Sequence, residues 1–373
     1  MKAVVVGGGI GGLAAAVALE RRGWEVEILE QAAELTAVGA GLSLWPNAVR
    51  ALDRLGLGEV VRQRALLGVR GGIQDTSGRW LARTDTDELE RRFGTAAVVH
   101  RADLVEALRA ALSAASLRTG VTVHAAHPDG TVLHSAGSSS GDLVVGADGV
   151  RSVVRQSVWP HAPAPRYVGY SAWRMLTRPM AVDEAVETWG RGERFGYAPL
   201  SDGRVYCFAV ANAREGAAHG GLAELRRRFG GWHEPIPALL DAVDDSDLLY
   251  HDIYDLPPLS SYVSGRVVLL GDAAHAMTPD LGQGACQALE DAVVLGDCLD
   301  LERPAAGDVE HAMVAYDEAR RPRAQTIARR SRQVGAVAQW SARPAVLLRN
   351  TALRLLPRSV FARSQAPVLS WPG

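Results

Sequence analysis

Residues 2–31 contain one complete β–α–β unit, and they constrain the fold more than any other part of the chain. The run Ala3–Val6 is rich in β-branched side chains, which is typical of a buried parallel strand. Gly7, Gly9 and Gly12 follow in the pattern GxGxxG. Gly7 allows a tight turn, Gly9 lets the backbone approach a pyrophosphate, and Gly12 lets the next helix pack closely on the strand. The pattern therefore predicts a dinucleotide site.

The elements that follow the glycines support this interpretation. A helix is expected over residues 11–22, and its start would direct free N–H groups and a positive dipole end at the pyrophosphate. A second strand over 24–29 ends at Glu30, where a carboxylate can accept hydrogen bonds from a ribose diol. Glycines in a simple turn between buried elements are the alternative, and the strand, helix and acid together argue against it. Glu30 also disfavours a 2′-phosphate, because the two anions would repel each other.

The composition limits the class of protein to which this chain can belong. The chain has 373 residues, of which 47% are hydrophobic and 22% charged, and its formal net charge is −2. This balance predicts a soluble globular protein with room for two domains, and it gives no support for nucleic-acid binding. No apolar run is long enough to span a bilayer. Because the N-terminus enters the first strand directly, we expect a cytoplasmic protein with no signal peptide and no stable membrane insertion.

Cysteine and lysine usage narrows the chemistry. Cys207, Cys286 and Cys298 form no CxxC pair, so we expect reduced and mostly buried thiols. No metal site is predicted. Lys2 is the only lysine, which excludes Schiff-base, P-loop and pyridoxal-phosphate chemistry at an internal lysine.

Two further strand-to-helix junctions look like parts of a nucleotide-binding domain. In the first, the strand 143–145 runs into Asp148-Gly149. In the second, the strand 266–270 runs into Gly271-Asp272, and a glycine-rich loop then precedes a helix over about 284–299. We therefore predict an α/β fold with a discontinuous, Rossmann-like domain built from residues 1–70, 96–160 and 262–330.

The intervening residues 71–95 and 164–260 are expected to form a second domain. The expected strands are 173–177, 185–189, 195–199 and 205–211, with one helix near 222–229. Glycine and aspartate between them supply turns. This pattern predicts an inserted, mainly antiparallel β-sheet domain that can wall off a pocket at the domain junction. Ser138–Ser140 is expected at the tip of a separate hairpin.

The C-terminal part, residues 331–373, is expected to be helical and to continue a helix that begins near residue 309. Its arginines Arg349, Arg354, Arg358 and Arg363 could meet a membrane surface or a pyridine-nucleotide phosphate. A solvated helix face is the interpretation that such a charge pattern favours.

The three nucleotide motifs occur in a defined order along the chain: GxGxxG, then Asp148-Gly149, then Gly271-Asp272. Residues 39–57 (GAGLSLWPNAVRALDRLGL) and 100–104 (HRADL) add to the pattern. In this order the chain resembles the single-component FAD-dependent aromatic hydroxylases, which are flavoprotein monooxygenases of the p-hydroxybenzoate hydroxylase type. The resemblance covers nearly the whole chain, and the ordered set is specific although each motif alone is modest.

The resemblance implies FAD as the cofactor and gives roles to individual residues. Arg101 would contact the pyrophosphate or the ribityl chain, and Asp272 would bind a ribityl hydroxyl. Asp148 would support both FAD and a transient nicotinamide donor, although N-capping is the alternative for both aspartates. The residues expected at the cofactor are Gly7, Gly9, Gly11, Gly12, Glu30, Gln31, Ser43, Arg101, Asp148, Asp272, Gly282, Gly284 and Ala285. The last three would pass beneath the flavin, where a helix start favours developing negative charge.

The resemblance also implies the reaction. The chain has neither a second GxGxxG for a resident NAD(P)H domain nor a redox CxxC, so dioxygen is the natural electron acceptor. NAD(P)H would reduce FAD, and reduced FAD with O2 would give a C4a-hydroperoxyflavin that hydroxylates an electron-rich aromatic or heteroaromatic ring. The protein must exclude water during this step. A monomer or a homodimer is expected.

The substrate residues are expected on the inserted sheet and on the flavin loop. Among the aromatic hydroxylases, GERF, GRVY and TPDLGQG look similar to the urate-hydroxylating branch, which places the catalytic roles on Arg194, Tyr206 and Asp280. Arg194, at the start of a strand, would bind an anionic substrate, and Tyr206 on the paired strand would orient or deprotonate it. Core packing is the alternative for Tyr206. Arg174 departs from the urate branch, where an amide is expected, and this makes urate itself a less favoured substrate.

Three other residues are candidates for a role at the active site. His275 could act as a base, but a structural imidazole bonded to backbone is favoured. His251 could reach the active site, and Trp45 could line the mouth of the pocket.

Other activities remain open. A flavin-dependent epoxidase, or a reductase or oxidase of an isoprenoid-like substrate, is one alternative. A non-catalytic flavin-binding protein is another, although the intact TPDLGQG loop argues against it. A flavin-dependent halogenase would need an active-site lysine and a WxWxIP run, and the sequence has neither.

Overall fold

A six-stranded sheet forms the centre of the N-terminal part of the molecule. The computed structural model describes residues 1–35, 40–218, 220–300 and 309–371, without the side chains of 358–363. The sheet has the order β18-β19-β12-β1-β2-β8. Its strands are β1 (Lys2–Val6), β2 (Glu25–Leu29), β8 (Leu117–Arg118), β12 (Leu143–Gly146), β18 (Val263–Ser264) and β19 (Val267–Leu269). All pairs are parallel except β18–β19. The valine-rich strands β1, β12 and β19 are buried, as central strands of a parallel sheet are.

Two helices pack closely on each other beside this sheet. They are α1 (Ile10–Glu20) and α10 (Gly284–Cys298). A Cβ at Gly11 would lie 3.3 Å from the Cβ of Ala288, and one at Gly296 would lie 2.9 Å from the Cβ of Ala18. These glycines therefore permit the close approach. The short helices α6 (Val153–Val158) and α9 (Asp272–His275) begin just after β12 and β19.

Smaller elements complete the N-terminal part. The helices are α2 (Pro46–Arg54), α3 (Gly58–Arg62) and α5 (Arg101–Ala110), and the strands are β3 (Gly41–Leu44), β4 (Leu66–Leu67), β7 (Ala97–His100), β9 (Val123–Ala126), β10 (Thr131–His134) and β11 (Gly137–Ser140). The serine triplet lies in β11, so the expectation of a hairpin tip there is wrong; the turn falls at Ser135-Ala136. Ser139 faces inward because its hydroxyl bonds to Glu27 and His134.

The second large sheet has seven strands in the order β17-β13-β16-β15-β14-β5-β6. They are β5 (Gly71–Asp75), β6 (Trp80–Arg83), β13 (Arg166–Leu176), β14 (Ala185–Trp189), β15 (Glu193–Pro199), β16 (Val205–Asn212) and β17 (Leu249–Asp255). Only the β14–β5 pair is parallel. The strands at 71–83 and 166–255 thus belong to one mainly antiparallel sheet, and α4 (Thr86–Phe93) follows β6.

The two faces of the seven-stranded sheet have different roles. On one face Phe195 and Cys207 pack with Phe229 in a core that includes α7 (Gly221–Phe229) and α8 (Ile236–Asp241). Side chains alternate along a strand, so Arg194 and Tyr206 lie on the opposite face. The single-turn helices η1 (Asp245–Asp247) and η2 (Pro279–Leu281) lie in connections.

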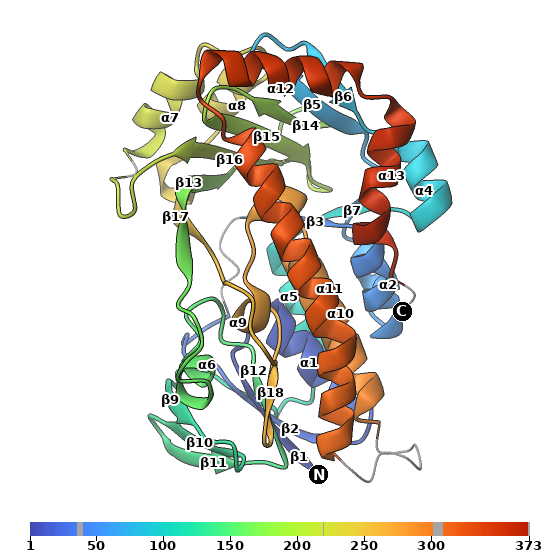
Figure 1. Ribbon diagram of the computed structural model, residues 1–373, viewed down its shortest axis with the longest axis vertical. Helices are drawn as coiled ribbons and strands as arrows, with labels where there is room; N and C mark the ends of the chain where they lie inside the picture. The colour runs from blue at the N-terminus through green and yellow to red at the C-terminus, as the bar shows by residue number, and fades with distance from the viewer. Residues whose placement is uncertain (36–39, 219, 301–308, 372–373) are drawn as a thin grey trace.

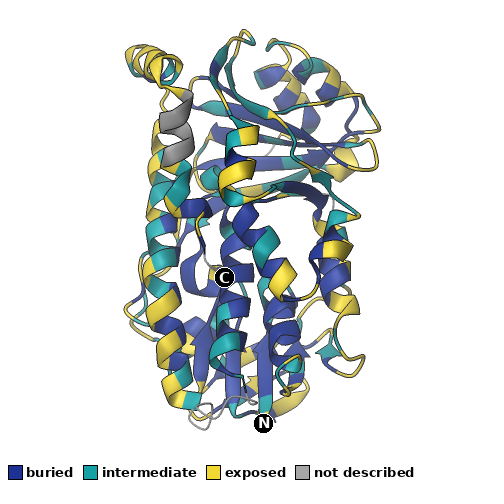
Figure 2. Cartoon of the chain, turned by 90° about the vertical axis from the view of Figure 1, so that its right-hand side faces the viewer, coloured by how far each residue is buried: buried dark blue, intermediate teal, exposed yellow. Residues whose placement is uncertain are grey.

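The C-terminal helices join the two large sheets. The helix α11 (Val309–Ala338) has 30 residues and runs from the six-stranded sheet to the seven-stranded sheet (Figure 1). There α12 (Arg343–Leu355) lies across the end of the molecule, and α13 (Arg358–Leu369) returns beside α4 toward α2. Figure 2 shows dark blue, buried helices and strands in the middle of the molecule and exposed helix faces at its periphery. None of the described helices combines the length and apolar character that crossing a bilayer requires.

Candidate active site

The glycine turn after β1 has the geometry that a pyrophosphate needs. Gly7 has φ +107°, and a Cβ there would lie 2.5 Å from the carbonyl oxygen of Ala147. A Cβ at Gly12 would lie 1.9 Å from the carbonyl oxygen of Gly7. By contrast, a Cβ at Gly9 would meet nothing within 4 Å. Gly7 and Gly12 therefore serve the protein's own packing, whereas Gly9 leaves open space beside the start of α1.

Glu30 is fixed across this turn. Its Oε2 accepts a hydrogen bond from the Gly8 N–H at 2.6 Å, and its Oε1 accepts one from the Ala32 N–H at 2.7 Å. A cavity of about 230 Å³ lies next to this region and is lined by Leu35, Ala102, Val105, Glu106 and Arg109. A Cβ at Gly8 would lie 3.0 Å from Leu35 Cδ2 and 3.1 Å from Glu30 Oε2, so the carboxylate and the cavity lie on neighbouring parts of the same surface.

Asp148 is both a helix cap and a candidate ligand. Its Oδ2 accepts hydrogen bonds from the N–H groups of Val153 and Val154 at 2.7 and 3.1 Å. Its Oδ1 is buried without a partner among the described residues. Burial raises the pKa of this carboxyl. Oδ2 therefore satisfies the capping role, and Oδ1 remains as the atom that a ligand would bind.

Asp272 begins α9, next to Arg101. Asp272 is exposed, yet the surrounding protein desolvates its carboxyl and raises the pKa of this group. Electrostatic interactions with His275 and Arg101 act in the opposite direction and lower the pKa. Gly271 before it is fixed because its N–H donates to Asp291 Oδ2 at 2.9 Å. A buried network thus positions the Gly271-Asp272 motif.

That network also decides the role of His275. Its Nε2 lies 2.6 Å from Asp291 Oδ2. The imidazole is therefore structural, as expected, but its partner is a carboxylate and not the expected backbone group. Arg320 of α11 donates to Asp291 Oδ1 at 2.7 Å and to Glu290 Oε2 at 2.6 Å. Both α10 carboxylates have fully buried side chains, and their charges are compensated. His275 is therefore a structural residue of this network.

The flavin loop between η2 and α10 is built for close approach of a flat ligand. Gly282 has φ +61°, and a Cβ there would lie 3.0 Å from Trp45 Nε1. That indole nitrogen is buried and has no hydrogen-bond partner in the described part of the chain. A Cβ at Gly284 would meet nothing within 4 Å. Behind the loop, Asn47 Nδ2 donates to Gln283 Oε1 at 3.0 Å, which ties the start of α10 to α2.

These features fit FAD. Open space at Gly9 and Gly284 and the unpartnered Asp148 Oδ1 are what an extended dinucleotide would fill and bond. The exposure of the other predicted cofactor residues varies. Gln31 and Ser43 are exposed, and Ala285 at the start of α10 is partly buried. Gly11 serves helix packing, as its contact with Ala288 shows.

Arg174 and Tyr206 form a pair on the inner face of the seven-stranded sheet. Arg174 Nη1 donates to the Tyr206 hydroxyl oxygen at 2.6 Å. Arg101 is close enough to interact electrostatically with this pair. Desolvation lowers the pKa of Arg101, the positive charge of Arg174 lowers it further, and the negative charge of Asp272 raises it. The geometry agrees, because the Arg101 N–H donates to the Ala40 carbonyl oxygen at 2.9 Å, and a Cβ at the adjacent Gly41 would lie 2.5 Å from the Tyr206 Cβ.

His251 belongs to the same group. It lies on β17, opposite Ala172 of β13. Burial lowers its pKa, and the charges of Arg174 and Arg101 lower it further. Its neutral form is therefore favoured, and neutral imidazole can accept a proton.

Arg194 and Asp280 are also brought together, but away from Tyr206. Arg194 is 2% exposed. Its guanidinium donates to Asp280 Oδ1 at 2.6 Å, to Glu187 Oε1 at 3.0 Å and to Gln339 Oε1 at 3.0 Å. Asp280 Oδ2 accepts a further hydrogen bond from Tyr170 at 2.7 Å. The structure thus shows these two predicted catalytic residues in a buried ion-pair cluster.

A glycine of α11 makes this cluster possible. A Cβ at Gly335 would lie 2.2 Å from Asp280 Oδ2 and 2.9 Å from the Tyr170 hydroxyl oxygen. Sequence reasoning missed Gly335, Tyr170, Glu187 and Gln339. One signal was present for Glu187, because the expected strands 185–189 and 195–199 place it near Arg194 on one sheet face.

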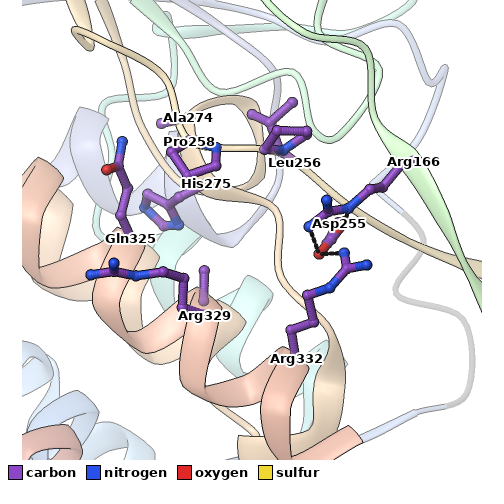
Figure 3. A pocket seen from close by; sticks show the side chains of 11 residues that line it. Arg166, Asp255, Leu256, Pro258, Ala274, His275, Gln325, Arg329 and Arg332 are labelled. Atoms are coloured by element: carbon purple, nitrogen blue, oxygen red, sulfur yellow. Dashed lines mark hydrogen bonds and ion pairs between the residues drawn. The ribbon is translucent and has the colours of Figure 1, made fainter. Parts of the chain in front are cut away.

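A second ionic contact joins the sheet to α11. Arg166 of β13 binds Asp255 of β17 at 2.7 and 3.0 Å, and Arg332 of α11 binds the same carboxylate at 2.5 Å. Figure 3 shows both guanidinium groups converging on Asp255, with His275 on the other side of a small cavity. The cavity measures about 30 Å³, which suits one or two water molecules. This contact therefore holds β13, β17 and α11 together.

Comparison with known proteins agrees with this geometry. The FAD binding domain family matches residues 1–213 and 258–331. The aurachin C monooxygenase/isomerase of Stigmatella aurantiaca is 38% identical over 363 residues, covering 95% of this chain and 94% of the relative. The FAD-dependent urate hydroxylase of Klebsiella pneumoniae is 36% identical over 349 residues, 89% of each chain. The 3-amino-4-hydroxybenzoate 2-monooxygenase of Streptomyces cremeus is 39% identical over 351 residues, 90% of this chain and 86% of the relative.

Solved structures show the same fold. Klebsiella pneumoniae HpxO complexed with FAD and uric acid superposes with a TM-score of 0.91 at 32% identity, over 100% of this chain and 98% of that one. The resemblance deduced from the three motifs is thereby confirmed, as are the mixed α/β fold and FAD as the cofactor. The chain belongs to the FAD binding domain family and is an FAD-dependent monooxygenase of the aromatic hydroxylase class.

Proposed function

We propose that this enzyme uses NAD(P)H and O2 to hydroxylate a small aromatic or heteroaromatic ring that carries an ionisable oxygen. The observation that supports this most directly is the Arg174–Tyr206 pair, which shares one electrostatic environment with Arg101 and Asp272. A hydroxyl group on the substrate ring would then lie between a phenol that can exchange a proton and the residues that bind FAD.

The chain's own residues would prepare the ring for attack. Bound FAD supplies the electron-transfer and oxygen chemistry. Tyr206 would hydrogen-bond the ring oxygen, and Arg174 would stabilise negative charge that develops on the Tyr206 oxygen. His251 has a pKa that desolvation and the two arginines lower, so it favours its neutral form and would add no positive charge to the site. A deprotonated ring oxygen makes the ring more electron-rich, which favours hydroxylation.

Arg194 and Asp280 would act on the flavin loop instead of binding the substrate directly. Both oxygens of Asp280 and three donors of Arg194 are engaged within the protein. Asp280 lies two residues before Gly282, so the cluster would hold the loop against the sheet. We therefore assign both residues a positioning role.

The names of the relatives support a class of aromatic or heteroaromatic substrates. Their names include a urate hydroxylase, an aminohydroxybenzoate monooxygenase and a monooxygenase of aurachin C. Hydroxybenzoates and urate carry acidic ring oxygens, in agreement with a site built around Arg174 and Tyr206. The guanidinium of Arg174 adds a fixed positive charge, so an anionic substrate is favoured over a neutral one.

The test is turnover of the FAD-loaded enzyme with a panel of hydroxybenzoates, hydroxyquinolines and purines. NADH or NADPH oxidation should be stimulated by one compound class, with little peroxide released, and the product should carry one oxygen atom from 18O2. Stimulation only by apolar isoprenoid-like olefins would point to an epoxidase. Flavin that neither donor reduces would contradict catalysis altogether.

Two variants locate the chemistry. In Tyr206→Phe we expect unchanged FAD content and a fall in kcat of about 100-fold, because positioned acid–base groups contribute at least this much. Tyr197→Phe is the matched control, since Tyr197 lies on the opposite face of the same sheet, in the core. Equal kcat for Tyr206→Phe and wild type would contradict the assigned role.

A further inference from the structure

The helix α12 carries an apolar surface that no described part of the chain covers. Leu347, Leu348 and Leu355 are 68%, 66% and 75% exposed. With Ala352, which is also exposed, they lie within an arc of about 140° on the helix, because successive residues are 100° apart. We name these four residues the α12 stripe. Monomeric proteins seldom leave so many large apolar side chains side by side in water, and such patches mark interaction sites.

The stripe is not the result of a loosely placed helix. Arg349, on the opposite side of α12, is 3% exposed. Its Nη1 donates to the carbonyl oxygen of Ala338 at 2.7 Å, and its Nη2 donates to that of Gly190 at 2.9 Å. Leu353 packs beside Trp189 in a small core with Leu81. Because this inner side is fixed to the sheet, α12 cannot roll to bury the stripe.

The C-terminal sequence that contains the stripe carries charges of one sign. From Ala319 to the C-terminus the sequence contains eleven arginines and no aspartate or glutamate. Arg343 and Arg354 of α12 are exposed, and at 100° per residue both fall beside one edge of the stripe. Arg354 is paired with Asp75 of β5. Trp340, just before α12, is 36% exposed. Arginine and tryptophan beside an apolar helix face are typical of helices that lie in a membrane interface.

We propose that α12 docks this enzyme on the surface of a membrane that contains anionic phospholipid. The thirteen residues of α12 span about 20 Å, too short for a bilayer but suited to lying in its interface. The stripe enters the boundary between headgroups and acyl chains, and the arginines attract the lipid phosphates. Figure 1 shows α12 at the end of the molecule farthest from the N-terminus, beside the light-blue turn between β5 and β6.

The experiment is vesicle flotation with the FAD-loaded protein, which needs no turnover and is therefore independent of the proposed function. Vesicles of phosphatidylcholine alone are compared with vesicles that contain about one third phosphatidylglycerol. We expect wild type to float with the anionic vesicles and to bind them about tenfold more weakly at high salt. The double variant Leu348→Glu/Leu355→Glu should lose at least about tenfold in partitioning. Leu133→Glu is the control, because Leu133 is 41% exposed on β10.

Three outcomes would overturn the proposal. Wild type that fails to float with anionic vesicles is the first. Equal flotation of wild type and the double variant is the second, with unchanged circular dichroism and flavin content showing that both are folded. The third is a dimer in light scattering that the double variant converts to a monomer while neither protein floats. In that case the stripe is a contact between two copies of the chain.

Discussion

Replacing Arg194 by Met tests whether this arginine positions the flavin loop or binds substrate. In the structure its guanidinium compensates the buried carboxylate of Asp280 and the partly buried carboxylate of Glu187, whose side chains are 0% and 24% exposed. Methionine fills a similar volume but provides no charge. Arg194→Met therefore leaves both carboxylates without a cation, and the Tyr170 hydroxyl remains as a partner of Asp280.

The cost follows from the burial. Removing one partner of a buried ion pair costs about 3–5 kcal/mol. For a chain of 373 residues, an unfolding entropy of about 2.1 cal/mol/K per residue gives about 0.8 kcal/mol/K in total, so Tm should fall by about 4–6 °C. The penalty also depends on pH. Burial raises the pKa of Glu187 even beside Arg194, and removing the arginine raises it further. A carboxyl with a higher pKa in the folded state destabilises the fold more as pH rises, so the Tm difference should be larger at about pH 8 than at about pH 5.

The assay is release of flavin fluorescence during heating of the FAD-loaded protein at both pH values. Arg191→Ala is the matched control, because Arg191 is an exposed arginine of the same turn that donates to the backbone of Ser341. Its Tm should change by less than about 1 °C. The reasoning would be refuted if Arg194→Met melted like wild type at both pH values while substrate affinity fell. Arg194 would then bind substrate directly, as the sequence alone suggests.

Three further predictions use single sites. Gly9→Ala should leave the stability of the apoprotein unchanged and weaken FAD binding at least about tenfold. Gly12→Ala should destabilise the apoprotein, because its Cβ would lie 1.9 Å from a carbonyl oxygen. Equal effects of the two variants in thermal melts and FAD titrations would contradict this prediction. Burial raises the pKa of Asp148, so its carboxylate destabilises the apoprotein increasingly above about pH 4. The difference in Tm by which wild type exceeds Asp148→Asn should therefore shrink as pH rises. A difference that grows with pH would contradict this prediction. Burial raises the pKa of Cys286 to about 12, so a thiol reagent should leave it unmodified in the native protein, and mass spectrometry after brief alkylation checks this.

The cofactor half of the site was predictable because its signals are local. The glycines, Glu30, Asp148 and Asp272 each stand at the end of a short buried strand, and strand ends of a parallel sheet meet at one edge. Their spacing in the sequence is therefore enough to place them. The bounds of the strands expected at 185–189 and 205–211 were also close, whereas β13 begins at Arg166, seven residues before the expected start, and β15 begins at Glu193, two residues before it. Charged side chains hid this strand end, and Arg194 is the second residue of β15, at the start of a strand as expected.

The substrate half was less predictable because its contacts are long-range. Tyr170 and Asp280 are 110 residues apart in the chain, and no local pattern marks them as partners. The pairing of Tyr206 with Arg174 depends on the register of β13 with β16, where Leu176 is opposite Tyr206. A strand prediction alone does not fix register. The strands β15 and β16 pair as expected, but Arg194 is opposite Val210 and Tyr206 is opposite Ala198, so the two side chains share a sheet face and have different partners.

Gly335 shows how the parts of the molecule depend on one another. It lies in α11, and its missing side chain leaves room for Asp280 Oδ2 and the Tyr170 hydroxyl. The same helix carries Arg320, which neutralises the two acids of α10, and Arg332, which binds Asp255 of β17. One helix thus contacts the flavin loop, the helix that follows it, and the sheet that bears the proposed substrate residues. Because each contact involves a buried or partly buried charge, a shift of α11 against either sheet would leave charges unpaired. We therefore expect α11 to influence the relative position of flavin and substrate as much as the residues that would touch either molecule.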